Sequence, residues 1–519
     1  MKKNVLASSV AAALVGLGMA GAAHANKVLV VPYYTAQAEH ATLLNIVNTD
    51  TINGKIVKVR FRGAANSDDV FDFQAFLSPG DVWSGRVSSS EDGPAMMATE
   101  DASCTKPAKA TLNSTPFVTS RLSSSLTAAQ KANQTREGYV EIFAMADVPS
   151  AVVGQPDVNK DGVNDLYTAI KHVGGVAPCS GAAWTALDKA TSNVGQRDTA
   201  VASAAAGLAL GMVPPTPGLF SNFTIINVAR AGAWDGEAEN MSQFDIVDPL
   251  AANRVPYWPQ TQVSVGADVN KLSADPLFLT GPDALNYAGV AVTSAAVAAA
   301  YYDLPDLSTP YAGDLSTPAV PAAQARALAN ILGTPSISNE FLVGPAEAST
   351  DWVFSMPTRR YAVAMNYAHT GAGDGRRFNA LLNNNHFGVS NTVVVGGLIC
   401  VTGISREIFN REEGTIANPD EVVISPSEIP PATAFCGEAS VLSINGGGAT
   451  TTETLSANVA VNDIDTTFQE GWMRLATPAA GGNATYYGLP VLGAAYTRAL
   501  SGDSFFAGSW KHRTGFGVN

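Results

Sequence analysis

Charged side chains are scarce in this chain of 519 residues, and the basic ones are the scarcer kind. Lys and Arg number 31 against 45 Asp and Glu, which gives a formal net charge of −14 at pH 7. A surface of that sign repels nucleic acid and anionic lipid and attracts divalent cations. We therefore expect no nucleic-acid partner.

Motifs that mark common active sites are also missing. The sequence has no HExxH zinc motif, no GxSxG nucleophile elbow, no Walker or dinucleotide loop and no CxxC pair. We therefore expect a protein that is not an enzyme, although two carboxylates placed by the fold, as in glycosidases, leave no sequence signature. The histidines after residue 25 show no metal-ligand spacing and indicate structural roles, with the last in a solvated basic context: His40, His172, His369, His386 and His512.

Long apolar runs are confined to the N-terminus. Two lysines precede the uncharged, mostly apolar residues 5–22, and Ala23-His24-Ala25 has the form of a cleavage site. This is the layout of a secretory signal peptide, residues 1–25, so we expect a mature chain that begins near Asn26 and is exported to the cell surface, the medium or the periplasm. Residues 284–302 are uncharged but rich in Ala, Val and Ser, which favours a buried helix over a membrane span.

Cysteine is limited to four residues. Cys104, Cys179, Cys400 and Cys436 form an even set, which in an exported chain predicts two disulfides. Three pairings are possible, and we favour Cys104–Cys179 with Cys400–Cys436 because these close the shorter loops.

Short strands separated by turns dominate the mature N-terminus. Residues 55–62 alternate between apolar and basic side chains, which predicts a half-buried antiparallel strand with Lys58, Arg60 and Arg62 on its polar face. Similar strand texture recurs up to the C-terminus, interrupted by alanine-rich runs at 182–212, 282–302 and 321–332 that predict helices. The expected fold is mainly β, with antiparallel β-sandwich domains and alanine-rich helical insertions.

Composition shifts divide the mature chain into four regions. We expect an N-terminal β-sandwich region at 26–149 and an insertion with a calcium-type loop and an alanine-rich helix at 150–218. A mixed β region with a helical insertion follows at 219–375, and a C-terminal β region at 376–519 ends the chain.

One local motif carries chemistry. Residues 157–165 (DVNKDGVND) match the start of an EF-hand-type calcium loop, with glycine at the sixth position. The twelfth position is Thr168, where that motif has a bidentate Glu, so we expect a structural site of weak affinity or an ordinary turn without metal. The predicted calcium ligands are Asp157, Asn159, Asp161, Val163 through its carbonyl group, and Asp165.

About a quarter of the chain resembles exported proteins of Gram-negative bacteria that are described as cell-surface or surface-layer proteins. The similar segments are VVPYYTA, TLLNIVNTD, VKVRFRGAANSDDVFDFQAFLSPGDVWSG, STDWVFSMPTRRYAV, YGLPVLGAAYTRA and WKHR. The resemblance implies a location and an architecture, and it carries no catalytic residues.

Three functions remain open at this point. The first is a calcium-stabilised structural protein that assembles with copies of itself into an array, attached to an outer-membrane component or a surface polysaccharide. The second is an adhesin or filament subunit whose free strand at 27–36 adds to a neighbour's sheet. The third is a secreted carbohydrate-binding protein or hydrolase, in which Trp83, Trp352 and Trp510 could line a sugar site, although in β-sandwiches such residues belong more often to the core or rim.

Overall fold

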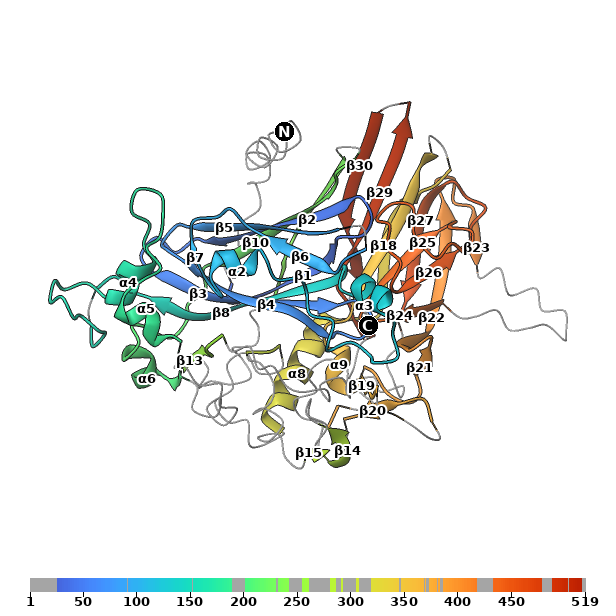
Figure 1. Ribbon diagram of the computed structural model, residues 1–519. Helices are drawn as coiled ribbons and strands as arrows, with labels where there is room; N and C mark the ends of the chain where they lie inside the picture. The colour runs from blue at the N-terminus through green and yellow to red at the C-terminus, as the bar shows by residue number, and fades with distance from the viewer. Residues whose placement is uncertain are drawn as a thin grey trace.

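The computed structural model shows a mainly β protein whose sheets are largely antiparallel, as the sequence predicts (Figure 1). The signal peptide predicted at 1–25 lies outside the described residues. The structure describes residues 26–515 apart from 91, 152, 189–200, 230–231, 242–253, 261–280, 286–290, 293–304, 308–318, 345–346, 368, 370–372, 380, 383–385, 418–432, 478–487 and 503.

The N-terminal part forms two sheets. A six-stranded sheet has the order β12-β1-β8-β3-β4-β7, and a five-stranded sheet has the order β11-β10-β2-β5-β6. The bounds are β1 (Val28–Thr35), β2 (His40–Asn48), β3 (Gly54–Gly63), β4 (Asp69–Leu77), β5 (Val82–Ser89), β6 (Ala95–Ala98), β7 (Cys104–Lys106), β8 (Glu137–Val148), β10 (Leu219–Asn227), β11 (Gly232–Glu237) and β12 (Glu239–Asn240), with short helices α2 (Lys109–Leu112) and α3 (Ala128–Gln134) between β7 and β8.

One hydrophobic core fills the space between these two sheets. Val31 of β1 and Phe73 of β4 come from the first sheet, and Ile46 of β2 and Trp83 of β5 come from the second. All four side chains are fully buried. The predicted β-sandwich is therefore confirmed, and Trp83 belongs to its core.

The opposite face of the six-stranded sheet is also buried. The strand predicted at 55–62 is present as β3, but the prediction that its basic face is exposed is wrong. Lys58, Arg60 and Arg62 of β3 have no exposed surface. Basic side chains are almost never fully buried unless they are paired. The segments that cover this face supply the partners, among them the described residues 305–307 and helix α9 (Arg359–Ala362), far along the chain.

The C-terminal part forms two more sheets, which stand on the right in Figure 1. One contains β21-β22-β27-β17-β31, with β23 and β24 paired to β22, and the other has the order β26-β25-β18-β29-β30. The bounds are β17 (Ser336–Leu342), β18 (Ser349–Ser355), β21 (Thr392–Val395), β22 (Leu398–Asn410), β23 (Thr415–Ala417), β24 (Thr433–Cys436), β25 (Ala439–Ile444), β26 (Val461–Ile464), β27 (Glu470–Ala476), β29 (Ala494–Ser501), β30 (Ser504–Lys511) and β31 (Arg513–Gly515).

Trp352 and His512 lie in the core between these two sheets. The His512 ring stacks on Phe354 at 4.8 Å between centroids, and its Nε2 donates to the Val353 carbonyl group over 3.0 Å. Burial lowers the pKa of His512 to about 3, so the ring is neutral. The solvated histidine expected here is wrong, because the last strands fold back against β18. Trp510, by contrast, is 50% exposed at the rim.

In the described parts of 182–212, which leave out 189–200, the insertion after β8 contains short elements where a long helix is expected. The bounds are α4 (Asp165–Ile170), α5 (Ala182–Ala186), β9 (Val201–Ser203) and α6 (Ala204–Leu208), with β9 paired to β13 (Arg254–Tyr257). Alanine favours helix only weakly, and pairing with β13 overrides that preference at β9.

The middle of the chain contributes small pieces that cover the lower side of the molecule in Figure 1. The bounds are β14 (Gly281–Leu285), β15 (Ala291–Val292), α8 (Ala319–Leu332), β16 (Gly333–Thr334), α9, β19 (Val363–Met365) and β20 (Arg376–Phe378). Strand β16 pairs with β28 (Leu489–Pro490), which comes from near the C-terminus. Helix α8 confirms the helix predicted at 321–332. The helix predicted at 282–302 is wrong where it is described, because β14 and β15 pair there.

Strand pairing does not follow the predicted regions. The region at 219–375 is split: β10, β11 and β12 complete the N-terminal sheets, while β17 and β18 belong to the C-terminal ones. Strand β1 is fully buried and pairs with β8 and β12. In this fold residues 27–36 are therefore not the free strand that the adhesin hypothesis requires.

Candidate functional site

Charged side chains meet in the interior between the N-terminal and C-terminal parts. Arg360 of α9 bonds through Nη2 to Glu141 Oε1 of β8 at 3.0 Å and to Asp306 Oδ2 at 2.8 Å. Arg62 of β3 reaches the same two carboxylates, at 2.9 Å from Asp306 and 3.4 Å from Glu141. These four side chains are at most 2% exposed. Four segments far apart in sequence are thus joined by one set of ion pairs.

Further pairs extend this group. Arg359 Nη2 lies 2.6 Å from Glu438 Oε2, and Arg60 donates to the Pro305 carbonyl group over 3.0 Å and lies 3.7 Å from Asp69. We call the whole set the charge cluster: Arg60, Arg62, Asp69, Glu141, Asp306, Arg359, Arg360 and Glu438. Four arginines face four carboxylates, so its charge is balanced.

Within the charge cluster, the pKa values of Asp306 and Glu438 are shifted in opposite directions. Burial disfavours ionised Asp306, but the guanidinium groups of Arg360, Arg62 and Arg60 outweigh it and lower the pKa of Asp306 to about 2. At Glu438 burial wins and raises the pKa, although Arg359 and Arg360 oppose it. A balanced cluster whose members bond one another is suited to holding the two parts together.

A second buried link joins the two parts through Glu137 of β8. Its carboxylate accepts from Tyr33 Oη at 3.1 Å, from Gln37 Nε2 at 2.7 Å and from the Asn458 backbone amide at 2.8 Å. Burial raises the pKa of Glu137 to about 7. Asp351 of β18 accepts a hydrogen bond from the Leu455 amide, and burial raises the pKa of its carboxyl group to about 6.

The raised pKa of Glu137 predicts a pH dependence of stability. The stabilisation is present below the unfolded pKa near 4.5 and is lost as pH rises through about 7. We expect Glu137→Gln, whose Oε1 can still accept from Gln37 and Asn458 while its Nε2 donates to Tyr33 Oη without ionising, to gain on the order of 2 kcal/mol over wild type between about pH 5 and pH 8. Urea unfolding of both proteins across that range measures the difference in their free energies of unfolding. Taking this difference cancels the contribution of His40 and His512, whose pKa values burial lowers in both proteins.

A matched control for this pH experiment is Glu413→Gln, which makes the same chemical change at an exposed position. Its difference from wild type should stay flat with pH. A flat difference curve for Glu137→Gln as well would contradict the raised pKa.

The predicted calcium loop lies at the surface next to α4. The Asp157 carboxylate accepts the backbone amides of Asp161 at 3.1 Å and Gly162 at 3.0 Å, while Asp161 accepts from Val163 and Asp165 accepts from Val158, both at 2.9 Å. Gly162 has φ +80°, a left-handed conformation that favours glycine. The spacing of the motif therefore produces a tight turn closed by its own carboxylates.

In this conformation the loop presents no ready metal cage. Among the described residues, no three His, Cys, Asp or Glu side chains are grouped so that they could hold an ion. The three carboxylates instead point at loop amides, although an ionised carboxylate has lone pairs for further partners. Asn159 is exposed and Val163 is half-buried. Calcium binding at Asp157, Asn159, Asp161, Val163 and Asp165 remains a prediction.

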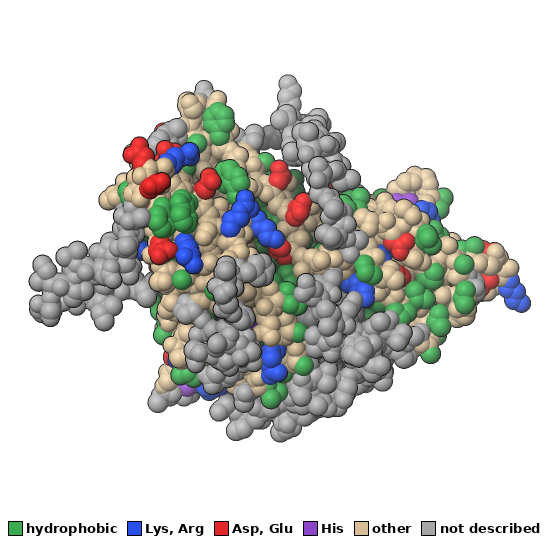
Figure 2. Space-filling model, turned by 180° about the vertical axis from the view of Figure 1, so that it is seen from behind, with side chains coloured by type: hydrophobic (Ala, Val, Ile, Leu, Met, Phe, Trp, Pro, Cys, Tyr) green, Lys and Arg blue, Asp and Glu red, His purple; other side chains and the backbone are tan. Residues whose placement is uncertain are grey.

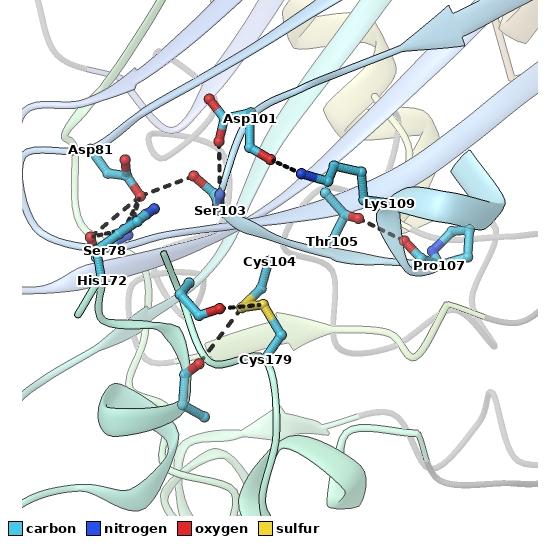
Figure 3. The surroundings of a disulfide bond; sticks show 12 residues. Ser78, Asp81, Asp101, Ser103, Cys104, Thr105, Pro107, Lys109, His172 and Cys179 are labelled. Atoms are coloured by element: carbon cyan, nitrogen blue, oxygen red, sulfur yellow. Dashed lines mark hydrogen bonds and ion pairs between the residues drawn. A yellow bond between two sulfur atoms is a disulfide. The ribbon is translucent and has the colours of Figure 1, made fainter. Parts of the chain in front are cut away.

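Both predicted disulfides are present. Cys104, at the start of β7, is bonded to Cys179, with 5.4 Å between their Cα atoms, and Cys400 of β22 is bonded to Cys436 of β24. Figure 3 shows the first pair tying the insertion to the edge of the six-stranded sheet. Within the described residues no helix is long and apolar enough to cross a membrane.

Ser78, Asp81 and His172 lie together near this disulfide (Figure 3). Ser78 Oγ is 3.2 Å from His172 Nδ1, and Asp81 Oδ2 is 3.4 Å from the same ring nitrogen. In a Ser-His-Asp triad the serine and the carboxylate use opposite nitrogens of the imidazole. Here they share one nitrogen, and Ser78 also donates to Asp81, so the group cannot pass a proton through the ring. It closes the turn between β4 and β5.

A cleft of about 930 Å³ lies beside the Cys104–Cys179 disulfide. Lys106, on its wall, lies 4.1 Å above the Trp184 ring and 2.7 Å from Asp188 Oδ2. The Trp184 ring also packs against the Phe76 ring of β4, with 4.7 Å between their centroids. These contacts hold the insertion on the sheet as well as shaping the cleft.

The charge cluster is the feature that sequence reasoning missed. The signal was present as paired basic residues, Arg359-Arg360, and as the alternating basic face of β3. Alternation shows that one face is polar but not whether another segment covers it.

Comparisons with known proteins give no match. No protein-family model matches the chain, and no curated protein and no solved structure is significantly similar to it.

Proposed function

We propose that this protein is an exported structural protein of the cell surface that assembles with copies of itself. The loop at 157–165 binds calcium and stiffens the insertion. The assembled protein is attached to an outer-membrane component or to a surface polysaccharide.

The observation that supports this function best is that charged and nucleophilic side chains bond to one another within the fold. Arg62, Arg360 and Asp306 bond one another in the interior, and Ser78 and His172 close a turn. Such groups stabilise a rigid body and are not offered to a substrate. Stiffness of this kind is what a coat subunit needs.

The two disulfides support export, because such bonds persist in oxidising compartments. The resemblance to exported surface proteins points the same way, and its segments contain Arg60, Arg62 and Arg359-Arg360 of the charge cluster. Figure 2 shows acidic and basic side chains interspersed with hydrophobic ones over the described surface seen from behind. A mixed surface of this kind suits contacts between proteins.

Negative-stain electron microscopy of the purified mature chain tests the proposal. We expect ordered sheets or patches in millimolar calcium that disperse when calcium is chelated. Fibres would favour the filament alternative, and a monomer indifferent to calcium at every concentration would overturn the proposal. Protease treatment of intact cells separates a surface location from a periplasmic one, since only a surface protein is cut.

Calcium should raise the melting temperature of the wild-type chain. For a dissociation constant of about 1 mM, about 10 mM calcium adds roughly 1.4 kcal/mol to the free energy of unfolding. We expect Asp161→Ala to lose this gain, because position 5 of the loop loses its carboxylate. Scanning calorimetry in calcium and in chelator measures both proteins, with Asp465→Ala, an exposed aspartate elsewhere, as the control. Equal calcium responses in all three proteins would remove calcium from the proposal.

Carbohydrate binding is a second candidate, favoured by the cleft beside the disulfide. Trp184, Asp188 and Lys106 supply an aromatic ring and polar groups there. Titration calorimetry with surface oligosaccharides checks it: heat that disappears in Trp184→Ala would support a sugar site in the cleft.

A further inference from the structure

The outer face of the C-terminal sheet formed by β17, β27 and β22 carries an aromatic pair, of which Trp472 is exposed and Phe409 is half-buried. Trp472 of β27 pairs in register with Phe409 of β22 on one side and with Glu340 of β17 on the other. The two rings stack at 4.2 Å between centroids with 9° between their planes. Trp472 is 40% exposed. Since large exposed aromatics on a rigid sheet commonly mark contact surfaces, this pair is a candidate docking site.

Two ion pairs flank the aromatic pair, one on each side along the strands. Arg474 Nη1 lies 3.7 Å from Glu407 Oε2, and Arg411 Nε lies 3.0 Å from Glu470 Oε2. The four side chains are 48–67% exposed. Exposed pairs of this kind contribute little to the stability of a single chain. They remain available to bond a partner.

The four charges form an elongated rectangle with alternating signs because β22 and β27 are antiparallel: its long side runs about 13 Å along the strands and its short side about 5 Å between them. Glu407 faces Arg474 across the strands, and Arg411 faces Glu470 in the same way. Along β22 the sign changes from Glu407 to Arg411, and along β27 it changes in the opposite sense. Every charge therefore has a partner of the other sign across the strands, and the sign on each strand is reversed at the far end of the rectangle.

Such a rectangle of alternating charges is complementary to itself. A two-fold axis parallel to the strands lays β22 of one copy on β27 of the other. Glu407 then meets Arg474 of the second copy, Arg411 meets its Glu470, and Phe409 meets its Trp472. An axis perpendicular to the strands also matches these charges, but it places Glu340 opposite its own copy, a like-charge contact that costs energy.

We infer that this surface, the outer face of β17, β27 and β22 around Phe409 and Trp472, is a two-fold contact between two copies of the chain. The inference rests on the proposed self-assembly and names the contact that it uses. Closed two-fold interfaces pair the same patch on both subunits, as this charge pattern allows. Each arginine then lies between its own glutamate and that of the second copy, away from water.

Charge reversal tests this contact. Arg411→Glu with Arg474→Glu makes the face wholly acidic, and Glu407→Arg with Glu470→Arg makes it wholly basic. We expect each double variant alone to weaken self-association by about tenfold or more, measured by analytical ultracentrifugation over a concentration series. A mixture of the two variants should associate again, because opposite faces then meet. Restored association in the mixture is a result that misfolding cannot imitate.

A matched control, Arg86→Glu with Lys131→Glu, reverses two basic residues elsewhere. It changes the net charge by the same amount as Arg411→Glu with Arg474→Glu does. It should associate as wild type does. Wild-type association that survives in both face variants, or a mixture that stays dissociated, would overturn the contact while leaving self-assembly standing. Wild type that never associates would remove the proposed function as well. Oligosaccharide binding to monomeric protein that is lost in Trp472→Ala would give the face to a polysaccharide and overturn the inference.

Discussion

Replacing Arg360 by methionine is expected to lower the free energy of unfolding by about 3–5 kcal/mol, the usual cost of removing one partner from a buried ion pair. The Arg360 guanidinium group bonds Glu141 and Asp306, and none of the three side chains is more than 2% exposed. Methionine fills part of the space but leaves these carboxylates short of positive charge in the interior. Because whole domains are stable by only about 5–15 kcal/mol, a large part of the reserve is lost.

Denaturant unfolding at pH 7 measures this loss, with Arg86→Met as the control at an exposed arginine, where we expect a change within about 0.5 kcal/mol. The loss should also shrink in acid. Wild-type Asp306 has its pKa lowered to about 2, so its stabilisation is present above about pH 4 and disappears as pH falls through about 2. In the variant that stabilisation is already reduced. A loss that does not change between pH 7 and pH 3 would argue against the electrostatic cause.

Removing the Cys104–Cys179 disulfide is expected to have a comparable effect. The bond closes a loop of 75 residues, and the chain-entropy estimate for that length is about 4 kcal/mol. In Cys104→Ser with Cys179→Ser, the insertion is still held by non-covalent contacts such as Lys106 with Asp188, Trp184 with Phe76, and the buried Leu166 and Ile170 in a core shared with the sheet. We therefore expect a lower melting temperature and easier local opening of the insertion.

Limited proteolysis with trypsin separates these two effects. Cleavage after Lys160 and Lys171, both in the insertion, should speed up in the double serine variant more than cleavage elsewhere. The companion variant without Cys400–Cys436, whose cysteines already pair across β22 and β24, should leave cleavage in the insertion unchanged. Unaltered cleavage in the Cys104 and Cys179 variant would show that packing alone holds the insertion.

Local patterns explain how much of the fold was predictable. Residue types along the chain located β1 and β3 within one residue, at 27–36 and 55–62, since such patterns depend only on neighbours along the chain. The hairpin of β21 and β22 shows the limit: residues 392–401 resemble one strand, yet Gly396 and Gly397 adopt positive φ angles of 58° and 82° and turn the chain. Alanine-rich segments were predicted least well, because their weak preference for helix yields to pairing with other strands.

The sequence by itself determined the mainly β class, the even set of cysteines and the compact turn at 157–165, because each follows from residue types at fixed spacing. Only the tertiary structure decided that Arg60 and Arg62 are buried, that Arg359-Arg360 and Asp306 reach them, and that Glu407, Phe409, Trp472 and Arg474 share one exposed face. The physical reason is separation along the chain. Alternation records that a face is polar, but whether that face meets water or another charged segment depends on contacts across hundreds of residues.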